Sequence, residues 1–388
     1  MAWTERYVRA DAAGGGDGTT DTNSGANGAW TLAEAIAAVG TGQRVNVKAG
    51  TYANTTTNRT FATAGTAIAP IWWRGFNSSA GDLDTDWSTA PPLITFTTGQ
   101  LALSGAHQVF SNLSITSQVT GANGAVVVSG GGVLDRVRVQ NTAANSASRA
   151  VTVTGNTFAR FTRCWLDATT TADATVHLNN AAGTNATMQS CYISGGVACF
   201  KSVSTVPCRM VLSNCHLISP ATYGIHITSV VDEYSLSVLG CTIYNPSSDG
   251  IRIDLISGAG PVLIANTIFS NCGGYGINNN SGANASQIAR LANDFYSCTS
   301  GNENGFGDHP AFAGVSESSS PFTNAAGGDF SLVTGALAIA GGSPGNIENT
   351  SLVGYMDIGA LQKQAGAGSG LGGNIIGSYG SVIRGAAA

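Results

Sequence analysis

Short stretches of alternating apolar and polar residues recur along the middle of the chain at nearly constant spacing. They are clearest within residues 210–298, where one phrase, first written Leu-Ser-Asn-Cys-His-Leu, appears four times with small changes. One anchor residue per copy gives steps of 26, 26 and 27 residues between these four. The same frame extends upstream to eight anchors: Leu113, Val137, Cys164, Cys191, Cys215, Cys241, Thr267 and Asp294. Alternation of period two predicts half-buried strands.

A repeat of about 25 residues with short strands, Gly/Asn turns and no helical period is typical of a parallel β-solenoid. The position two residues after each anchor is always apolar and predicts an inward column: Ile115, Val139, Leu166, Ile193, Leu217, Ile243, Phe269 and Tyr296. The position before each anchor is rich in Asn, which tolerates left-handed backbone angles. It predicts a column of turns: Asn112, Arg136, Arg163, Ser190, Asn214, Gly240, Asn266 and Asn293.

Polar residues on the predicted outer face suggest a first candidate site. Eleven residues after three successive anchors stand His226, Arg252 and Asn278, and Asp254 follows Arg252 by two. Stacked rungs would bring His226, Arg252 and Asp254 together, and such a group could bind or deprotonate a sugar acid. The competing interpretation, which we prefer, is an ordinary solvated face.

Aromatic residues on the outer face suggest a second candidate site. The position one after the anchor holds Trp165, Tyr192 and His216 on three consecutive rungs. Sugar rings and partner subunits both pack on such strips. We expect a subunit contact here, with glycan contact as the alternative.

The amino-terminal region predicts a loop, a helix and a strand. Residues 11–28 form a Gly/Asp loop, in which Asp17, Asp21 and Asn23 could hold calcium, although their spacing does not match an EF-hand. Residues 30–39 predict a helix with Thr31 as N-cap, which we expect to cover the open end of the solenoid. Residues 44–52 predict the first strand and turn.

The last 24 residues change to a Gly/Ala-rich composition. Such a segment buries little area against its own fold. We expect it to be an assembly element that contacts neighbouring chains through its few larger side chains, Ile375, Ile376, Tyr379, Val382 and Ile383.

Composition narrows the function classes. Charged residues make up 10% of the chain with a net charge of −5, so no basic stripe indicates nucleic-acid binding. No apolar run of 18 residues predicts a membrane span, and the amino terminus lacks the apolar core of a secretion signal. Four of the eight Cys fall on one predicted inward column, and no CxxC pair or Cys/His zinc spacing occurs. We therefore expect synthesis in the cytoplasm, free buried thiols, and no metal or cofactor.

The two ends of the chain resemble a known family. Tyr7-Val8, the Gly/Asp loop, the helix and Val45-Asn-Val-Lys-Ala-Gly-Thr-Tyr52 are similar to the amino-terminal part of pectin-lyase-like, right-handed parallel β-helix proteins. Pro321-Phe322, Gly328-Asp-Phe-Ser-Leu332 and Asp357-Ile-Gly-Ala360 resemble their closing segment. The resemblance covers about residues 5–362. It implies an all-β, single-stranded right-handed parallel β-helix with an N-terminal capping helix and an extended C-terminal tail.

Four segments are expected: the amino-terminal region (1–52), the β-helix (53–300), the closing segment (301–362) and the assembly tail (363–388). The family contains polysaccharide lyases, glycoside hydrolases, phage tailspikes and other virion parts. The sequence shows no aspartate cluster on three successive rungs of the kind that pectate lyases use for calcium.

Our preferred hypothesis is a non-catalytic bacteriophage virion protein, such as a spike, fibre or capsid decoration. We expect it to form a homotrimer and to contact other virion proteins and host polysaccharide. A polysaccharide lyase or glycoside hydrolase on the same fold is the alternative, with His226, Arg252 and Asp254 as its catalytic residues. An exported cell-surface adhesin is a third possibility.

Overall fold

The computed structural model describes residues 3–54, 58–84, 90–121, 123–155, 158–180, 183–204, 208–229, 234–255, 261–280, 285–307, 311, 314–339, 342 and 358–360. The chain divides into two compact units, Met1–Ala186 and Thr187–Ala388. The described part is almost entirely strand, with one α-helix and three short 3-10 turns, η1 (Asp82–Asp84), η2 (Ala285–Gln287) and η3 (Ala325–Gly327). The five assembly residues expected in the tail, Ile375, Ile376, Tyr379, Val382 and Ile383, lie outside the described residues.

The first unit is a parallel β-solenoid. Strands of one sheet, called sheet A here, pair in parallel from rung to rung, and a second parallel sheet, sheet B, forms another face. The elements of sheet A are β1 (Thr4–Val8), β2 (Gln43–Lys48), β3 (Thr51–Asn54), β5 (Ile71–Phe76), β6 (Leu93–Phe96), β8 (Gln108–Ser117), β10 (Gly132–Asn141), β12 (Phe158–Thr162) and β13 (Trp165–Ala168). Those of sheet B are β4 (Arg59–Phe61), β7 (Leu101–Leu103), β9 (Gly124–Val128), β11 (Arg149–Thr154) and β14 (Ala174–Asn180).

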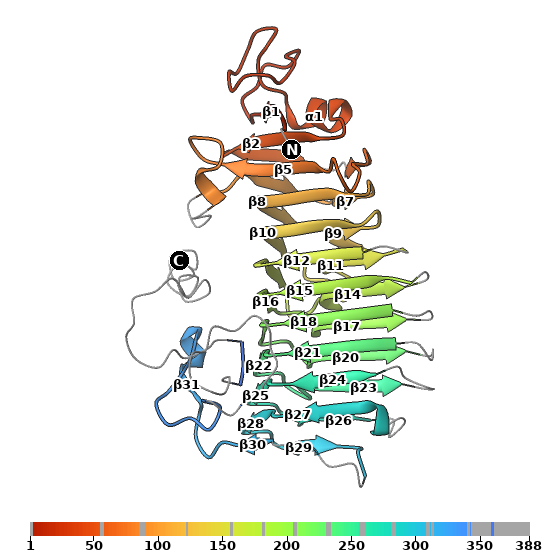
Figure 1. Ribbon diagram of the computed structural model, residues 1–388, viewed down its shortest axis with the longest axis vertical. Helices are drawn as coiled ribbons and strands as arrows, with labels where there is room; N and C mark the ends of the chain where they lie inside the picture. The colour runs from red at the N-terminus through yellow and green to blue at the C-terminus, as the bar shows by residue number, and fades with distance from the viewer. Residues whose placement is uncertain are drawn as a thin grey trace. The chain divides into compact units, whose positions relative to one another are not determined.

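The second unit repeats this arrangement (Figure 1). Its sheet A strands are β16 (Tyr192–Ser194), β18 (Cys208–Ser213), β19 (His216–Ile218), β21 (Tyr234–Leu239), β22 (Thr242–Tyr244), β24 (Val262–Ala265), β25 (Ile268–Ser270), β27 (Ile288–Leu291), β28 (Asp294–Tyr296) and β30 (Val315–Ser316). Its sheet B strands are β17 (Ala198–Ser204), β20 (Tyr223–Ser229), β23 (Ile251–Leu255), β26 (Tyr275–Asn279) and β29 (Gly301–Asn304). Strand β15 (Asn185–Gln189) lies at the division between the units, and β31 (Phe322–Asn324) pairs with β32 (Asp329–Leu332) in an antiparallel hairpin.

The predicted rung frame is confirmed for seven of the eight copies. Left-handed backbone occurs at Asn112, Arg136, Arg163, Ser190, Asn214, Gly240 and Asn266, which is the predicted turn column. The paired residues Leu217, Ile243 and Phe269 are fully buried in the second unit. These turns bend the chain between two strands, so the apolar residues on both sides of each turn point into the core.

The eighth copy departs from the prediction by one residue. Ala292, not Asn293, takes the left-handed angle, and Phe295, not Tyr296, pairs with Phe269 and is buried. The side chain of Asn293 accepts a hydrogen bond from Thr267 N at 3.1 Å and donates one to Ile264 O at 3.0 Å. Asn293 therefore satisfies buried backbone groups of neighbouring rungs, and the shift moves Asp294 into the column of outward positions.

The amino-terminal region begins one strand earlier than expected. Strand β1 pairs in parallel with β2, so residues 44–52 are not the first strand. The helix α1 (Leu32–Ala38) has Thr31 as its N-cap, and a capping box with Glu34 satisfies two backbone N–H groups at its start.

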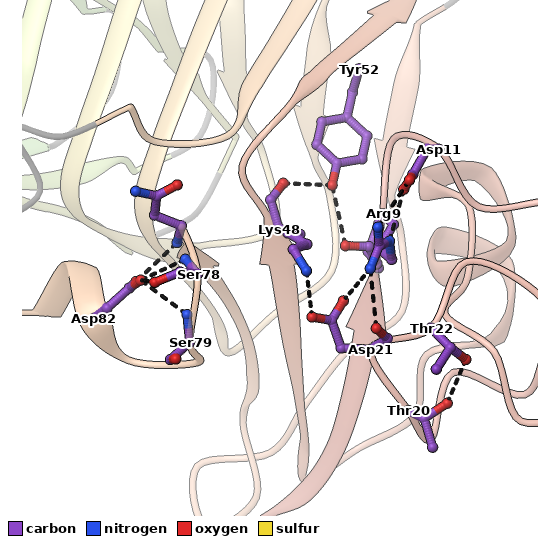
Figure 2. Close-up of polar contacts among 12 residues, drawn as sticks. Arg9, Asp11, Thr20, Asp21, Thr22, Lys48, Tyr52, Ser78, Ser79 and Asp82 are labelled. Atoms are coloured by element: carbon purple, nitrogen blue, oxygen red, sulfur yellow. Dashed lines mark hydrogen bonds and ion pairs between the residues drawn. The ribbon is translucent and has the colours of Figure 1, made fainter.

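A polar network attaches the Gly/Asp loop to the first strands (Figure 2). Asp21 is within ion-pair distance of both Arg9, at 3.3 Å, and Lys48, at 2.6 Å. Asp17 accepts hydrogen bonds from the backbone N–H and the hydroxyl group of Thr19. The two carboxylates of the considered calcium site thus have protein partners, and no cluster of three or more metal-ligating side chains occurs among the described residues.

An ion pair lies inside the last rung of the second unit. Arg290 occupies the inward position next to Ile264, and Glu303 the one next to Ile277. The two side chains form an ion pair, and the Phe306 ring lies 3.7 Å from the Arg290 guanidinium carbon. One apolar column of each sheet, through Ile264 in sheet A and Ile277 in sheet B, therefore ends in a pair of opposite charges.

The β31–β32 hairpin covers the outward side of β19, β22 and β25, which form one part of sheet A in the second unit. In Figure 1, β31 lies beside β22 and β25. The apolar cluster beneath it joins Ile218 and Ile268 of the sheet to Phe322, Phe330 and Leu332 of the hairpin. This outward face is therefore an internal surface of the unit.

We expect all eight Cys to be free thiols. The structure contains eight free cysteines, seven of them buried, with Cys298 partly exposed. Burial raises the pKa of the Cys215 thiol well above its ordinary value, which keeps it protonated and unreactive. Titrating denatured protein without reductant should detect nearly eight thiols per chain, and recovery of two or fewer would contradict this assignment.

Candidate functional site

The candidate site lies on the outward face of sheet B in the second unit, across β17, β20, β23 and β26. The parallel register pairs Lys201 with His226, His226 with Arg252, and Arg252 with Asn278. The neighbouring Ile225, Ile251 and Ile277 are fully buried. Because residues alternate between faces, the polar residues point outward, as the sequence predicts.

Asp254 is the centre of the site. His226 Nε2 lies 2.9 Å from Asp254 Oδ2, and Arg252 Nε donates to both oxygens at 3.2 and 3.0 Å. Asn280 Nδ2 donates to Oδ1 at 2.8 Å. Burial alone would raise the pKa of Asp254, but the hydrogen bonds from His226, Arg252 and Asn280 hold that pKa below its ordinary value. Asp254 is therefore an ionised carboxylate that orients the two cation-forming side chains.

A second carboxylate, that of Asp249, lies next to Arg252. Asp249 is buried, and it accepts hydrogen bonds from Tyr275 N at 2.9 Å and Asn278 Nδ2 at 2.8 Å. Arg252 Nη1 lies 3.7 Å from Asp249 Oδ2. Arg252 therefore lies between two carboxylates, and its guanidinium also covers the Tyr223 ring at 5.4 Å.

His226 is held with a defined tautomer. Its ring centroid lies 4.6 Å from that of Tyr223, and burial lowers its pKa below the ordinary value in spite of the opposing effect of Asp254. The imidazole is thus mainly neutral at pH 7. Because Nε2 faces a carboxylate, it carries the proton and donates to Asp254, which leaves Nδ1 as the acceptor.

The site provides cations and one weak base but no carboxylic acid. Its carboxylates are engaged by hydrogen bonds, and the described carboxyl groups with a raised pKa, Asp294 and Glu303, belong to other parts of the unit. Hydrolysis of a glycosidic bond normally needs a protonated carboxyl group as general acid. The geometry is therefore suited to binding an anion, or to removing a proton with His226 while Arg252 stabilises negative charge.

The three residues of the second predicted site, Trp165, Tyr192 and His216, do not form one exposed strip. His216 is 1% exposed, lies 5.3 Å from the Phe330 ring, and has a pKa lowered to about 4 by burial. It is covered by the hairpin and offers no surface to a glycan. Tyr192 is half-buried against the same cluster, and Trp165, in the first unit, is half-exposed under the guanidinium of Arg138.

The predicted set of site residues leaves out three contributors to the site: Tyr223, Asp249 and Asn280. The first two stand in the phrases Tyr223-Gly-Ile and Asp249-Gly-Ile, at equivalent positions of adjacent rungs. That equivalence could have placed an aromatic ring and a carboxylate beside His226 and Arg252.

Among the described residues, no helix is long and apolar enough to span a membrane.

Solved structures with a similar fold include two polysaccharide lyases. Pectate lyase Pel9A is 14% identical with a TM-score of 0.63, and the match covers 94% of this chain and 98% of that one. A rhamnogalacturonan lyase is 11% identical with a TM-score of 0.50, covering 80% and 86% of the two chains. No protein-family model and no curated protein matches the sequence. This chain therefore has the right-handed parallel β-helix fold of pectin-lyase-like proteins, as expected, whereas the capping role of the helix and the extended tail stay predictions.

Proposed function

We propose that this protein is a non-catalytic β-helix protein that binds acidic polysaccharide on the sheet B face of its second unit. The observation that carries the proposal is the column of Lys201, His226 and Arg252 on successive rungs, oriented by an ionised Asp254. Carboxylates of an extended acidic glycan can pair with the two permanent cations of this column, Lys201 and Arg252, and Tyr223 adds an aromatic surface. The setting we propose is a bacteriophage virion, as a homotrimeric spike, fibre or capsid decoration in contact with other virion proteins. That part rests on the family resemblance.

A polysaccharide lyase is the alternative, favoured by one observation. The neutral His226, held by Asp254 at 2.9 Å and flanked by Arg252, resembles a general base beside a charge-stabilising cation. β-Elimination would use His226 Nδ1 to take the proton from the carbon next to the carboxylate of a uronic acid. A carbon–carbon double bond would form as the bond to the glycosidic oxygen breaks, and that oxygen would take a proton from water. The similar solved structures include a pectate lyase and a rhamnogalacturonan lyase, so pectic polysaccharides are the first substrates to test.

Calorimetric titration with oligogalacturonate separates the two functions. We expect salt-sensitive binding by the wild-type protein and roughly tenfold weaker binding after Arg252→Ala, since one charge-assisted contact is worth about 1.4 kcal/mol. Arg209→Ala is the matched control, because Arg209 is an exposed arginine on β18 of sheet A. The ultraviolet absorbance of unsaturated sugars should not increase during long incubation. Formation of unsaturated product that His226→Ala abolishes would establish the lyase. Unchanged binding by Arg252→Ala would refute the column of Lys201, His226 and Arg252, called the sheet B ladder below, as a binding site.

A further inference from the structure

The outward face of sheet A in the first unit carries a polar and aromatic patch that the sheet B site does not use. The strand register aligns Ser114, Arg138 and Trp165 on three rungs, and Thr116, Gln140 and Asp167 two residues further along. All six are half-buried, whereas Ile115, Val139 and Leu166 between them are buried. The patch is therefore a surface of the solenoid and not part of its core.

Arg138 is the unusual member of this patch. Its guanidinium carbon lies 4.7 Å from the Trp165 ring centroid, so it is held flat on the indole. Among the described residues it has no carboxylate partner, and its Nε–H is shielded from water with no hydrogen-bond partner. Because this N–H is shielded from a ligand as well, an anion would pair with the terminal N–H groups of the guanidinium.

Two arginines near Arg138 in the sequence, Arg136 and Arg163, do have a carboxylate partner. Arg163 donates to both oxygens of Asp135 at 2.7 Å, and Arg136 Nε donates to the same carboxylate at 3.1 Å. Arg136 also donates to the Asp84 carbonyl. Their charges are used within the fold, which leaves Arg138 as the cation of this patch that is oriented but not neutralised.

Hydrogen-bonding groups lie next to the guanidinium. Gln140 Nε2 donates to Asp167 Oδ2 at 3.2 Å, so these two side chains support each other across adjacent rungs. The hydroxyl groups of Ser114 and Thr116 line the preceding rung. A cation on an indole, an amide–carboxylate pair and hydroxyl groups together provide the contacts that an acidic sugar requires.

We propose that Arg138 and Trp165 form a second, separate subsite for an acidic sugar, whose carboxylate or sulfate pairs with the guanidinium. Gln140 and Asp167 then bind hydroxyl groups of the same sugar. The inference extends the proposed function to another face and another unit, and it rests on different residues. Arginine is required because its planar fork can stack on Trp165 and pair with two oxygens at once, which lysine cannot do.

The test is the binding stoichiometry of a short oligogalacturonate. The full-length wild-type protein should bind two oligosaccharides per chain, and Arg138→Met should bind one, since Met retains the packing on Trp165 without the charge. Arg138→Lys should weaken this subsite by about tenfold while keeping the charge. Dextran sulfate beside neutral dextran distinguishes sulfate recognition from carboxylate recognition. Unchanged melting temperatures of both variants, with Arg209→Ala as the control for charge, show that the fold is intact.

Each other outcome decides between the two sites. If Arg138→Met still binds two oligosaccharides, or if the single site of the wild type survives in it, the subsite is refuted. If that single site is lost in Arg138→Met but survives in Arg252→Ala, the sheet B ladder fails and the subsite stands. An unchanged stoichiometry accompanied by a changed oligomeric state in sedimentation would identify the patch as a subunit contact and overturn the proposal. Absence of any binding by the wild type refutes both.

Discussion

Replacing Leu217 or Ile243 by aspartate should prevent the second unit from folding. Both side chains are completely buried, and they stack on each other in the inward column that continues to Phe269. A carboxylate in this column would have apolar neighbours and no cation to pair with. Leaving a charge buried without a partner costs about 3–5 kcal/mol, a large part of the 5–15 kcal/mol that stabilises a typical domain.

Solubility, far-UV circular dichroism and thermal unfolding measure this effect. Ser237→Asp is the matched control, because Ser237 lies on the neighbouring strand β21 and is half-exposed on its outward side. We expect Ser237→Asp to fold and melt like the wild type while Leu217→Asp is recovered as insoluble protein. A soluble Leu217→Asp with an unchanged spectrum and melting temperature would show that the rung register is wrong.

Asp294→Asn should stabilise the protein at pH 8 and have little effect near pH 4. Asp294 is fully buried, and no side chain donates a hydrogen bond to its carboxylate oxygens; only the Phe295 N–H favours the ionised form. Burial, and secondarily the Glu317 carboxylate, raises the pKa of Asp294 to about 7. The folded chain therefore holds a proton on Asp294 that the unfolded chain releases near pH 4, so stability falls as pH rises from about 4 to 7.

The shift corresponds to a loss of up to about 4 kcal/mol above pH 7, at about 1.4 kcal/mol per pKa unit. Asn has nearly the same shape and no charge, so it should recover part of this loss. Urea unfolding of both proteins at pH 4 and pH 8 gives the difference. His216, on the same covered face, has a pKa lowered to about 4 by burial, and it therefore reduces stability as pH falls below about 6.5.

Both the wild type and Asp294→Asn contain His216, so its opposite pH dependence cancels when their unfolding free energies are subtracted. Glu317→Gln is the second control. It should give a smaller gain at pH 8, because it removes only the lesser cause of the shift. A variant Asp294→Asn that is equally stable or less stable than the wild type at pH 8 would contradict the account of Asp294 as a buried acid.

Much of the fold could be predicted because its information is local and periodic. Asn112, Asn214 and Asn266 mark turns through a backbone preference of the residue itself. The same preference misled at Asn293, since the burial of Phe295 decides that rung and Ala292 accepts the left-handed angle instead. Where packing and turn preference disagree by one residue, packing prevails because a slip would turn every side chain to the other face.

The candidate site was predictable in part for the same reason. His226 and Arg252 occupy one offset from their anchors, so the repeat aligned them. The fate of His216 was not predictable, because the hairpin that covers it comes more than 100 residues later, and Phe330 carries no periodic signal. Long-range covering of a face depends on tertiary packing that a repeat pattern does not encode.

The buried pair of Arg290 and Glu303 bears on how long such a protein can become. Internal rungs present apolar columns to both neighbours, so a duplicated internal rung would again pack apolar side chains on apolar side chains. A rung added beyond Glu303 would meet two charges where it needs apolar partners. Duplication of a rung is therefore less costly upstream of this pair than directly after it.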